Sequence, residues 1–370
     1  MLRIRLVAPA LAFFTFFAFL FAAQPRIHPA ISIRTIARQA VAPALDEDGA
    51  DAESEAAGAY HVTVLDLFNH ENFAQLEDIG DDARSQKSRF RGGGWKLAAF
   101  YGAISSPGSG TATDAEWKAH FERLQRWIAF RPDSSTPRVA LADSYLRFAW
   151  KARGSGTSDT VTPEGRKLFF DRAEKAREIL EKAKSLSTSD PHWFLVMHKV
   201  SRAQEWTPQQ AKQLLEEAYN VEPNYYYFYD SYAFSLLPRW YGKPGDSEAF
   251  AESIADRVGT SEGDVIYFNI ALHENCCKAR PQMPALSWDR VKQGFASSEQ
   301  LYRSTNFQRN AMAYMAVRGG DKEFAQQIFG RIGDNWSKRV WREKRNFDYA
   351  KDSLSLRPVT PHPTTPSTDE

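Results

Sequence analysis

Residues 190–223 have the sequence DPHWFLVMHKVSRAQEWTPQQAKQLLEEAYNVEP, which carries the clearest fold signal in the chain. It holds two short amphipathic helix patterns, and each opens on a capping residue followed by proline, Asp190-Pro191 and Thr207-Pro208. Gln210 follows Thr207 at the spacing of a capping box. Two such helices joined by a short turn form one helical hairpin.

The same layout recurs along the chain between residues 113 and 331. Pro191 is matched by Pro223 and Trp206 by Trp240, at spacings close to the roughly 34 residues of a tetratricopeptide unit. Further start signals are Thr113 with Glu116, Thr162-Pro163, and Asp321 after Gly319-Gly320. These patterns predict an all-α fold, a right-handed α-solenoid of degenerate tetratricopeptide-like helix hairpins in a single folded body.

The N-terminus has the pattern of an export segment. Arg3 and Arg5 precede an apolar run over residues 6–23, which predicts a signal peptide or membrane anchor over residues 1–23. Both fates stay open, because Phe21 or Leu20 would stand at the small-residue position before the two obvious cleavage sites. The protein is therefore expected to be exported to the periplasm, either soluble after cleavage or tethered to the inner membrane by residues 6–23.

Composition sets the remaining boundaries. Residues 24–59 end in an Ala-, Gly- and acid-rich stretch and predict a disordered tether, and the Pro/Thr-rich residues 353–370 predict a disordered tail. The helical-repeat domain then spans residues 60–352. With 47 basic and 46 acidic residues, the chain has no charge excess for nucleic acid. The only cysteines, Cys276 and Cys277, are adjacent, so no disulfide framework is predicted.

An aromatic cluster near residue 225 is the candidate binding site. Tyr225, Tyr229 and Tyr232 recur at helical spacing and predict one face that carries three phenols. The candidate binding residues are Tyr225, Tyr229, Tyr232, Arg239, Trp240 and Tyr241. The alternative is that these rings pack between repeats, as aromatic stripes at helical spacing usually do.

Other motifs give no catalytic, metal or cofactor site. Residues 273–277 (HENCC) crowd soft ligands into one helical turn without the second cluster that zinc requires. Residues 154–156 and 91–94 are glycine-rich but follow no strand, so the latter is predicted to be a flexible link. His192 and His198 do not share a helical face and are expected on the surface or as hydrogen-bonded core residues.

Several segments resemble a bacterial family catalogued as domain-of-unknown-function family 4034. The most specific are RPDSSTPRVALADSYLRFAWKARGSG at residues 131–156 and LLPRWYGKPGD at residues 236–246. The resemblance spans roughly residues 62–350. It implies a helical-repeat fold and a bacterial origin, and because the family has no assigned activity it implies no catalytic residue.

These observations lead to two functional hypotheses. Helical repeats without a catalytic motif favour a scaffold in the bacterial cell envelope that binds an unknown protein or peptide partner, contacts the membrane only through its N-terminal apolar segment and is not an enzyme. The alternative is an envelope enzyme that acts on glycan or peptidoglycan through paired carboxylates in a solenoid cleft, because export and abundant Trp and Tyr suit sugar binding.

Overall fold

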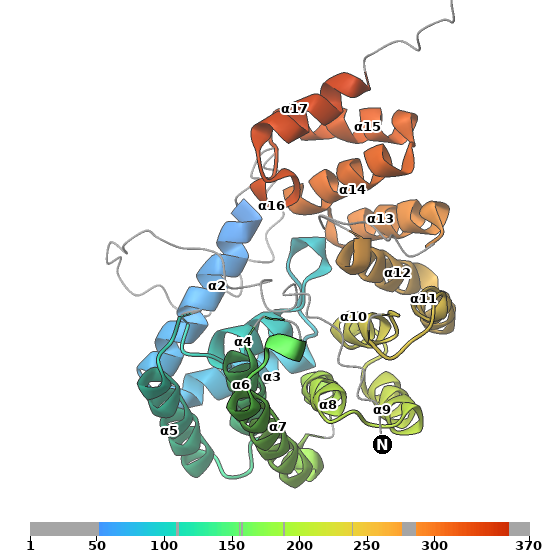
Figure 1. Ribbon diagram of the computed structural model, residues 1–370. Coiled ribbons are helices and arrows are strands. Elements are labelled where there is room, and N and C mark those ends of the chain that lie inside the picture. The colour runs from blue at the N-terminus through green and yellow to red at the C-terminus, as the bar shows by residue number, and fades with distance from the viewer. Residues whose placement is uncertain are drawn as a thin grey trace, which may run out of the picture. The chain divides into compact units, whose positions relative to one another are not determined.

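The computed structural model describes residues 52–108, 111–154, 156, 158–187, 189–238, 240–275 and 286–354 (Figure 1). Within these ranges the regular structure is sixteen α-helices and three short 3-10 helices, and the only β pairing is an isolated bridge between Arg89 and Trp95. The all-α prediction is confirmed. None of the described helices combines the length and apolar character that a membrane span requires.

The described residues form two compact units, residues 52–274 with 286–304, and residues 305–354. The helix patterns had predicted one folded body. Those patterns report local amphipathicity, and they carry no information on how packing is divided between distant helices.

The first unit opens with three α-helices that pack on one another and with one 3-10 helix, which packs on a later helix of the unit. These are α2 (Ala52–Asn69), α3 (Phe73–Ser85), η1 (Arg91–Gly93) and α4 (Lys96–Ile104). α2 begins at Ala52, so the end of the predicted tether, residues 52–59, is helical; Ala and Glu, which dominate this stretch, are good helix formers. α4 is almost entirely buried between its neighbours.

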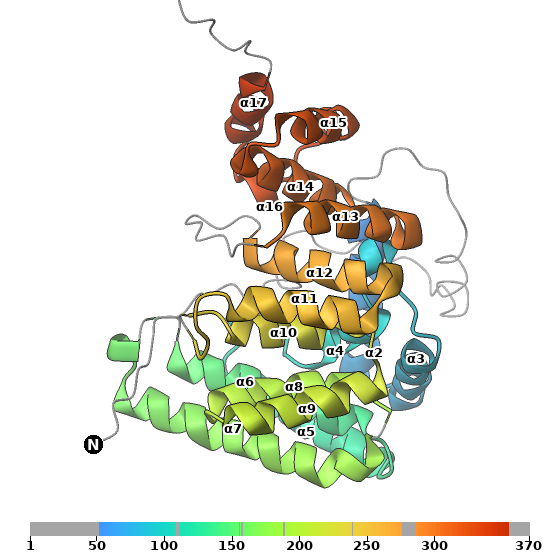
Figure 2. The same ribbon diagram turned by 90° about the vertical axis from the view of Figure 1, so that its right-hand side faces the viewer.

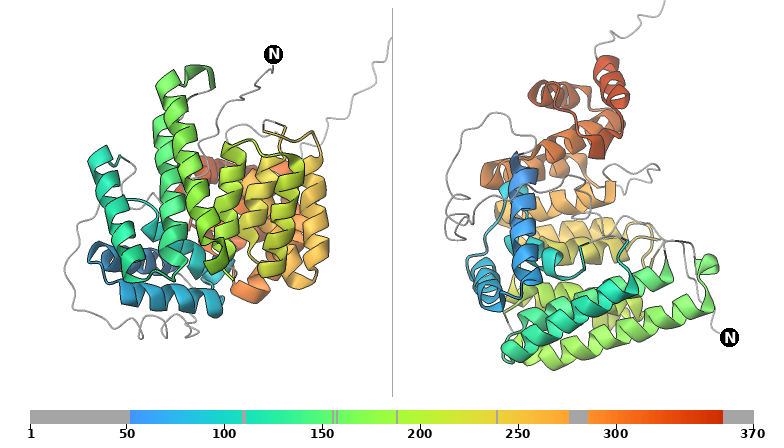
Figure 3. Two further views of the ribbon diagram at one scale, coloured as in Figure 1. Left: turned by 90° about the horizontal axis from the view of Figure 1, so that it is seen from below. Right: turned by 90° about the vertical axis from the view of Figure 1, so that its left-hand side faces the viewer.

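Five more α-helices follow, and each packs on the next. They are α5 (Asp114–Phe130), α6 (Thr136–Arg153), α7 (Pro163–Ala183), α8 (Pro191–Ala203) and α9 (Pro208–Val221), with η2 (Ser158–Thr160) and η3 (Lys184–Leu186) between them. The predicted caps form: Thr113 and Thr207 make complete capping boxes, and the Asp190 carboxylate accepts a backbone N–H of α8. Seen from below, α5, α6 and α7 lie side by side (Figure 3).

The last helices of the first unit continue the stack (Figure 2). They are α10 (Tyr226–Ser235), α11 (Asp246–Val258), α12 (Thr260–Asn275) and α13 (Trp288–Tyr302). Glycine allows close approach where α13 crosses α12: a Cβ atom at Gly294 would lie 2.3 Å from the carbonyl oxygen of Asp264.

The second unit consists of α14 (Asn306–Gly319), α15 (Lys322–Ile332), α16 (Lys338–Trp341) and α17 (Lys344–Ser353). The predicted glycine stop and Asp cap are present, since Gly320 is left-handed and the Asp321 carboxylate accepts the N–H of Phe324. Phe329, Trp341 and Phe347 pack together as its aromatic core.

Candidate functional site

The structure does not gather the predicted aromatic residues on one exposed face. Tyr225 and Tyr229 are each only 1% exposed, whereas Tyr232 and Trp240 are half-buried. Tyr241 is 54% exposed. Arg239 lies outside the described residues, as do Cys276 and Cys277.

The buried rings are part of the packing between helices. Tyr225 packs edge-on against Trp95 of the N-terminal region, with 5.1 Å between ring centroids, and its hydroxyl is hydrogen-bonded to His192 of α8 at 2.7 Å. Tyr232 packs on His198 of α8. The alternative stated above, that these rings pack between helices, describes the contacts of Tyr225 and Tyr232.

The residues that cover Tyr225 belong to an ordered hairpin formed by residues 88–96. Its backbone is closed by hydrogen bonds from Phe90 N–H to Gly94 O (2.7 Å) and from Lys96 N–H to Ser88 O (2.9 Å). The tip turns through Gly92 and Gly93, which have φ of 75° and 81°. The prediction of a flexible link at residues 91–94 is therefore wrong: the glycines supply positive φ in a fixed turn.

Three cations at alternate positions in this region contact residues at three of the helix ends in the stack. We call them the basic segment: Lys87, Arg89 and Arg91. Their contacts are Lys87 Nζ with Glu222 at 2.6 Å, Arg89 Nη1 with Glu262 at 3.7 Å, and Arg91 Nε donating to the Ser304 carbonyl at 3.0 Å. Glu222 follows α9, Glu262 lies in the first turn of α12, and Ser304 follows α13.

The middle cation is the most enclosed. The Arg89 guanidinium lies between the rings of Trp95 and Tyr302, at 4.1 Å and 5.0 Å from their centroids. The Tyr302 hydroxyl also donates to Glu262. A desolvated guanidinium between two aromatic faces gains a cation–π interaction in addition to its ion pair.

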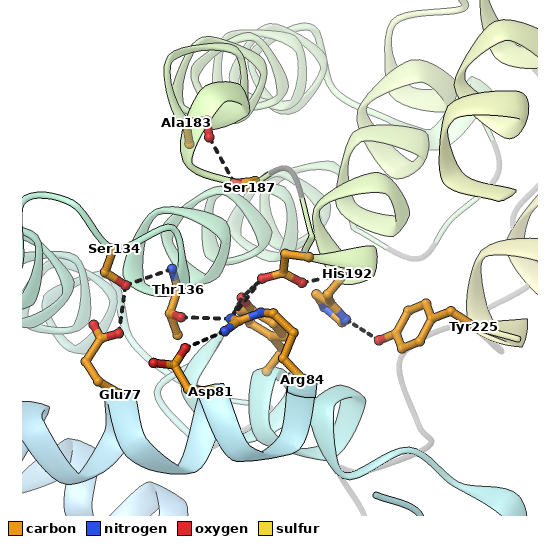
Figure 4. A network of polar contacts seen from close by, with 11 residues as sticks. Glu77, Asp81, Arg84, Ser134, Thr136, Ala183, Ser187, His192 and Tyr225 are labelled. Atoms are coloured by element: carbon orange, nitrogen blue, oxygen red, sulfur yellow. Dashed lines mark hydrogen bonds and ion pairs between the residues drawn. The ribbon is translucent and has the colours of Figure 1, made fainter. Parts of the chain in front are cut away.

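Arg84 of α3 joins α6 and α8 in a network of polar contacts (Figure 4). The Arg84 Nη2 group donates to Thr136 at the start of α6 (3.0 Å) and to Asp190 at the start of α8 (3.1 Å), and Tyr101 also donates to Asp190. Burial disfavours the charged guanidinium, but the Asp190 carboxylate and the Tyr101 hydroxyl outweigh this effect and raise the pKa of Arg84 above its ordinary value.

His192 links this network to the aromatic core. Its ring stacks on Tyr101 with 4.2 Å between centroids. Burial, together with the charge of Lys199, lowers the pKa of His192 to about 3, so the imidazole is neutral at physiological pH. A neutral, stacked and hydrogen-bonded histidine serves packing here, in agreement with its interpretation as a hydrogen-bonded core residue.

A second buried charge cluster centres on Asp143 of α6. Its carboxylate accepts from Arg147 Nε at 3.0 Å and from Lys199 Nζ at 2.8 Å. Burial would raise the pKa of Asp143, but Arg147 and Lys199 hold it below its ordinary value. The carboxylate is thus fixed in its ionised form and cannot act as a general acid near neutral pH.

One open hollow lies on the surface between α7 and the end of α8. It has a volume of about 500 Å³ and is lined by Phe170, Asp171, Glu174 and Gln204. The Phe170 ring lines the hollow and is exposed to solvent. Tyr241, another exposed ring, lies close by, because its hydroxyl donates to the carbonyl of Arg202 at 2.7 Å.

The carboxylates of this hollow do not form an acid–base pair. The Arg177 guanidinium hydrogen-bonds Glu174 and lowers the pKa of that carboxyl, whereas a general acid at neutral pH requires a raised pKa. A strongly raised pKa does occur at Asp230, through burial and the neighbouring Glu274 charge, but these two acids do not line the hollow. In the described ranges, no group of three or more His, Cys, Asp or Glu residues is placed to hold a metal ion.

Comparison of the chain with family models, with curated proteins and with solved structures finds no match.

Proposed function

We propose that this protein is an exported scaffold of the bacterial cell envelope that binds a protein or peptide partner. We further propose that the stacked helices of the first unit form a right-handed α-solenoid of degenerate tetratricopeptide-like hairpins. The support is the consecutive packing of α5 to α9, the stack from α8 to α13, and the resemblance of the sequence to a helical-repeat family. Arrays of this kind provide extended surfaces for recognition.

The hollow between α7 and α8 is the observation that carries the proposal. It combines an exposed aromatic anchor, Phe170, with the polar side chains of Glu174 and Gln204. Tyr241 adds a second exposed ring with a polar tip. Aromatic anchors surrounded by polar groups carry most of the affinity at protein interfaces.

The proposed binding surface differs from the one expected from sequence. Of the six candidate binding residues, only Tyr241 is strongly exposed among those that the structure describes. Phe170 takes the place of Tyr225 and Tyr229 as the aromatic anchor, because both of those rings are buried. Recognition is better supported than glycan hydrolysis, since the pKa of Glu174 in the hollow is lowered by Arg177 and not raised as a general acid requires.

The test is site-specific photocrosslinking of the full-length protein in its native cells. A photoreactive phenylalanine replaces Phe170 in one variant and the exposed Val62 of α2 in the control. We expect one defined protein adduct from position 170 and not from position 62. When the photoreactive residue instead stands at a surface position next to the hollow, Tyr241→Ala should lower the yield of the adduct by up to about tenfold.

Two results would contradict the proposal: no adduct at position 170, or the same adducts from both positions. Fractionation of the same cells checks the expected location, because an exported protein must be recovered outside the cytoplasmic fraction. Retention of residues 1–23, read from the N-terminal peptides, distinguishes a tethered protein from a cleaved one.

A further inference from the structure

We propose that the edge of the first unit that holds Glu222, Glu262 and the carbonyl groups after α13 is a receptor for a basic peptide. Residues 87–91 of the chain are its resident ligand and can be exchanged for a peptide of the same chemistry. This inference is independent of the α7–α8 hollow, which lies on other residues.

The spacing of the cations supports this assignment. Lys87, Arg89 and Arg91 stand at alternate positions, and their partners follow one another along the chain in the same order. The segment that carries them is a shaped loop, because Lys87 has a left-handed backbone and Arg91 begins η1. The receptor side is periodic as well: the partners Glu222, Glu262 and Ser304 recur at about forty residues, a spacing within the range of helical repeat units.

The receptor presents acidic groups and helix-terminal carbonyls, which are the partners that a basic peptide requires. The carboxylates of Glu222 and Glu262 form ion pairs with Lys87 and Arg89, respectively. The carbonyl oxygens of Arg303 and Ser304 accept from the Gly92 N–H at 2.9 Å and from Arg91 Nε at 3.0 Å. Carbonyls at a helix C-terminus are otherwise unsatisfied and carry partial negative charge.

Exchange can start at Lys87. Its side chain is 59% exposed although its partner Glu222 is only 5% exposed. Lys87 also has φ of 50°, and Arg303 at the other end has φ of 60°. Left-handed backbone costs a non-glycine residue roughly 1–2 kcal/mol, so release of the segment relieves the strain at Lys87 that its contacts otherwise offset.

The rest of the hairpin provides a fixed anchor during exchange. Trp95 is buried against Tyr225, and α4 behind it is buried along its length. Arg84 is held by Asp190. Because the segment is tethered at both ends, its effective concentration at the receptor is high, on the order of millimolar or above. A free peptide should therefore bind weakly until the resident cations are removed.

The experiment uses full-length protein and a fluorescein-labelled peptide with the sequence of residues 85–94, SQKSRFRGGG. The receptor variant carries Lys87→Ala, Arg89→Ala and Arg91→Ala. A control peptide has the same composition with its three cations adjacent. Fluorescence anisotropy gives the affinities at low and high salt, and circular dichroism and thermal unfolding show that the variant is folded.

We expect the triple variant to bind the native-order peptide at least about tenfold more tightly than the wild type does. Adding Glu222→Gln and Glu262→Gln to that variant should remove this gain, and salt should weaken binding because the contacts are ionic. The inference is overturned if the folded triple variant does not bind, if it binds both peptides equally, or if neutralising the two acids has no effect.

A measurement on the wild type covers the case in which the triple variant does not fold. The amides of Phe90 and Gly92 are hydrogen-bonded to Gly94 and Arg303. Excess native-order peptide should speed hydrogen exchange at these two amides and leave the buried helix α4 protected. Unchanged exchange at Phe90 and Gly92 under saturating peptide would equally overturn the inference.

Discussion

Arg84 and Asp190 lie 106 residues apart in the sequence and form a buried ion pair, with 3.1 Å between Nη2 and Oδ2. The same guanidinium also contacts Asp81 at 2.7 Å, but Asp81 is 68% exposed whereas Asp190 is 1% exposed. One cation thus makes a surface ion pair and a core ion pair at once. The two carboxylates form a matched pair for measuring what each kind of contact contributes.

Asp190→Ala should destabilise the first unit strongly. The substitution leaves the Arg84 charge buried without its core partner, and removal of one member of a buried pair costs about 3–5 kcal/mol. Loss of the α8 cap adds about 1 kcal/mol. Asp81→Ala removes only an exposed contact and should cost less than about 1 kcal/mol. Urea unfolding of both variants measures the difference, and equal losses would contradict the buried pair.

Acid should destabilise the protein below about pH 6.5. Burial lowers the pKa of His198 to about 3, with a further contribution from the Arg202 charge, and burial likewise lowers the pKa of His120 to about 3. In the unfolded chain these groups titrate near pH 6.5. Between the two values the unfolded state binds more protons, so the free energy of unfolding falls as the pH falls.

The measurable quantity is the slope of unfolding free energy against pH, which reaches about 1.4 kcal/mol per pH unit for each such histidine. His198→Gln removes one titrating group and should make the slope shallower between pH 6 and 4, whatever it does to stability at pH 7. Denaturant unfolding of the wild type and the variant at several pH values between 4 and 6 measures the two slopes. A variant whose profile runs parallel to that of the wild type would show that burial of His198 does not cause the dependence.

The turn of the 88–96 hairpin should not accept a side chain. A Cβ atom at Gly93 would lie 3.1 Å from Tyr302, at φ of 81°. Gly93→Ala should therefore cost about 1–2 kcal/mol through its backbone conformation alone. Gly58→Ala in α2 is the control, because nothing lies within 4 Å of its Cβ position, and it should be neutral or stabilising by up to about 1 kcal/mol. Thermal unfolding compares the two; similar effects would show that the turn is not fixed.

Local signals in the sequence predicted local structure well. The capping box at Thr207, the Asp190-Pro191 start and the Gly320-Asp321 boundary are all present, because a cap depends on residues within one helical turn. Residues 52–59 were predicted to be disordered from their polarity, although their alanines and glutamates also favour the helix that forms.

Contacts between distant segments were beyond the sequence patterns. Helical spacing placed Tyr225 on a face, but only the fold shows that Trp95 covers that face. The glycines at 92–94 were interpreted as a link, since their partner Arg303 is far away in the sequence.

In the second unit, Asn310 should be intolerant of a change to Asp. Its Oδ1 accepts from Ser337 N–H at 3.1 Å and from Trp341 Nε1 at 2.9 Å, while its Nδ2 donates to the carbonyl of Asn306 at 2.9 Å. Asn310 is fully buried. Asn310→Asp replaces the donating amide with a carboxylate oxygen that faces a carbonyl, and the variant must either bury a charge or leave an acceptor unsatisfied, at a cost of about 1–3 kcal/mol or more. Asn346→Ala, which removes a single bond to the Trp341 carbonyl from an exposed side chain, should cost less than about 1.5 kcal/mol. Hydrogen exchange at the Ser337 amide measures the hydrogen bond to Asn310 directly. Exchange should accelerate strongly in Asn310→Asp and little in Asn346→Ala. Similar protection in the two variants would show that Asn310 does not hold α16 to α14.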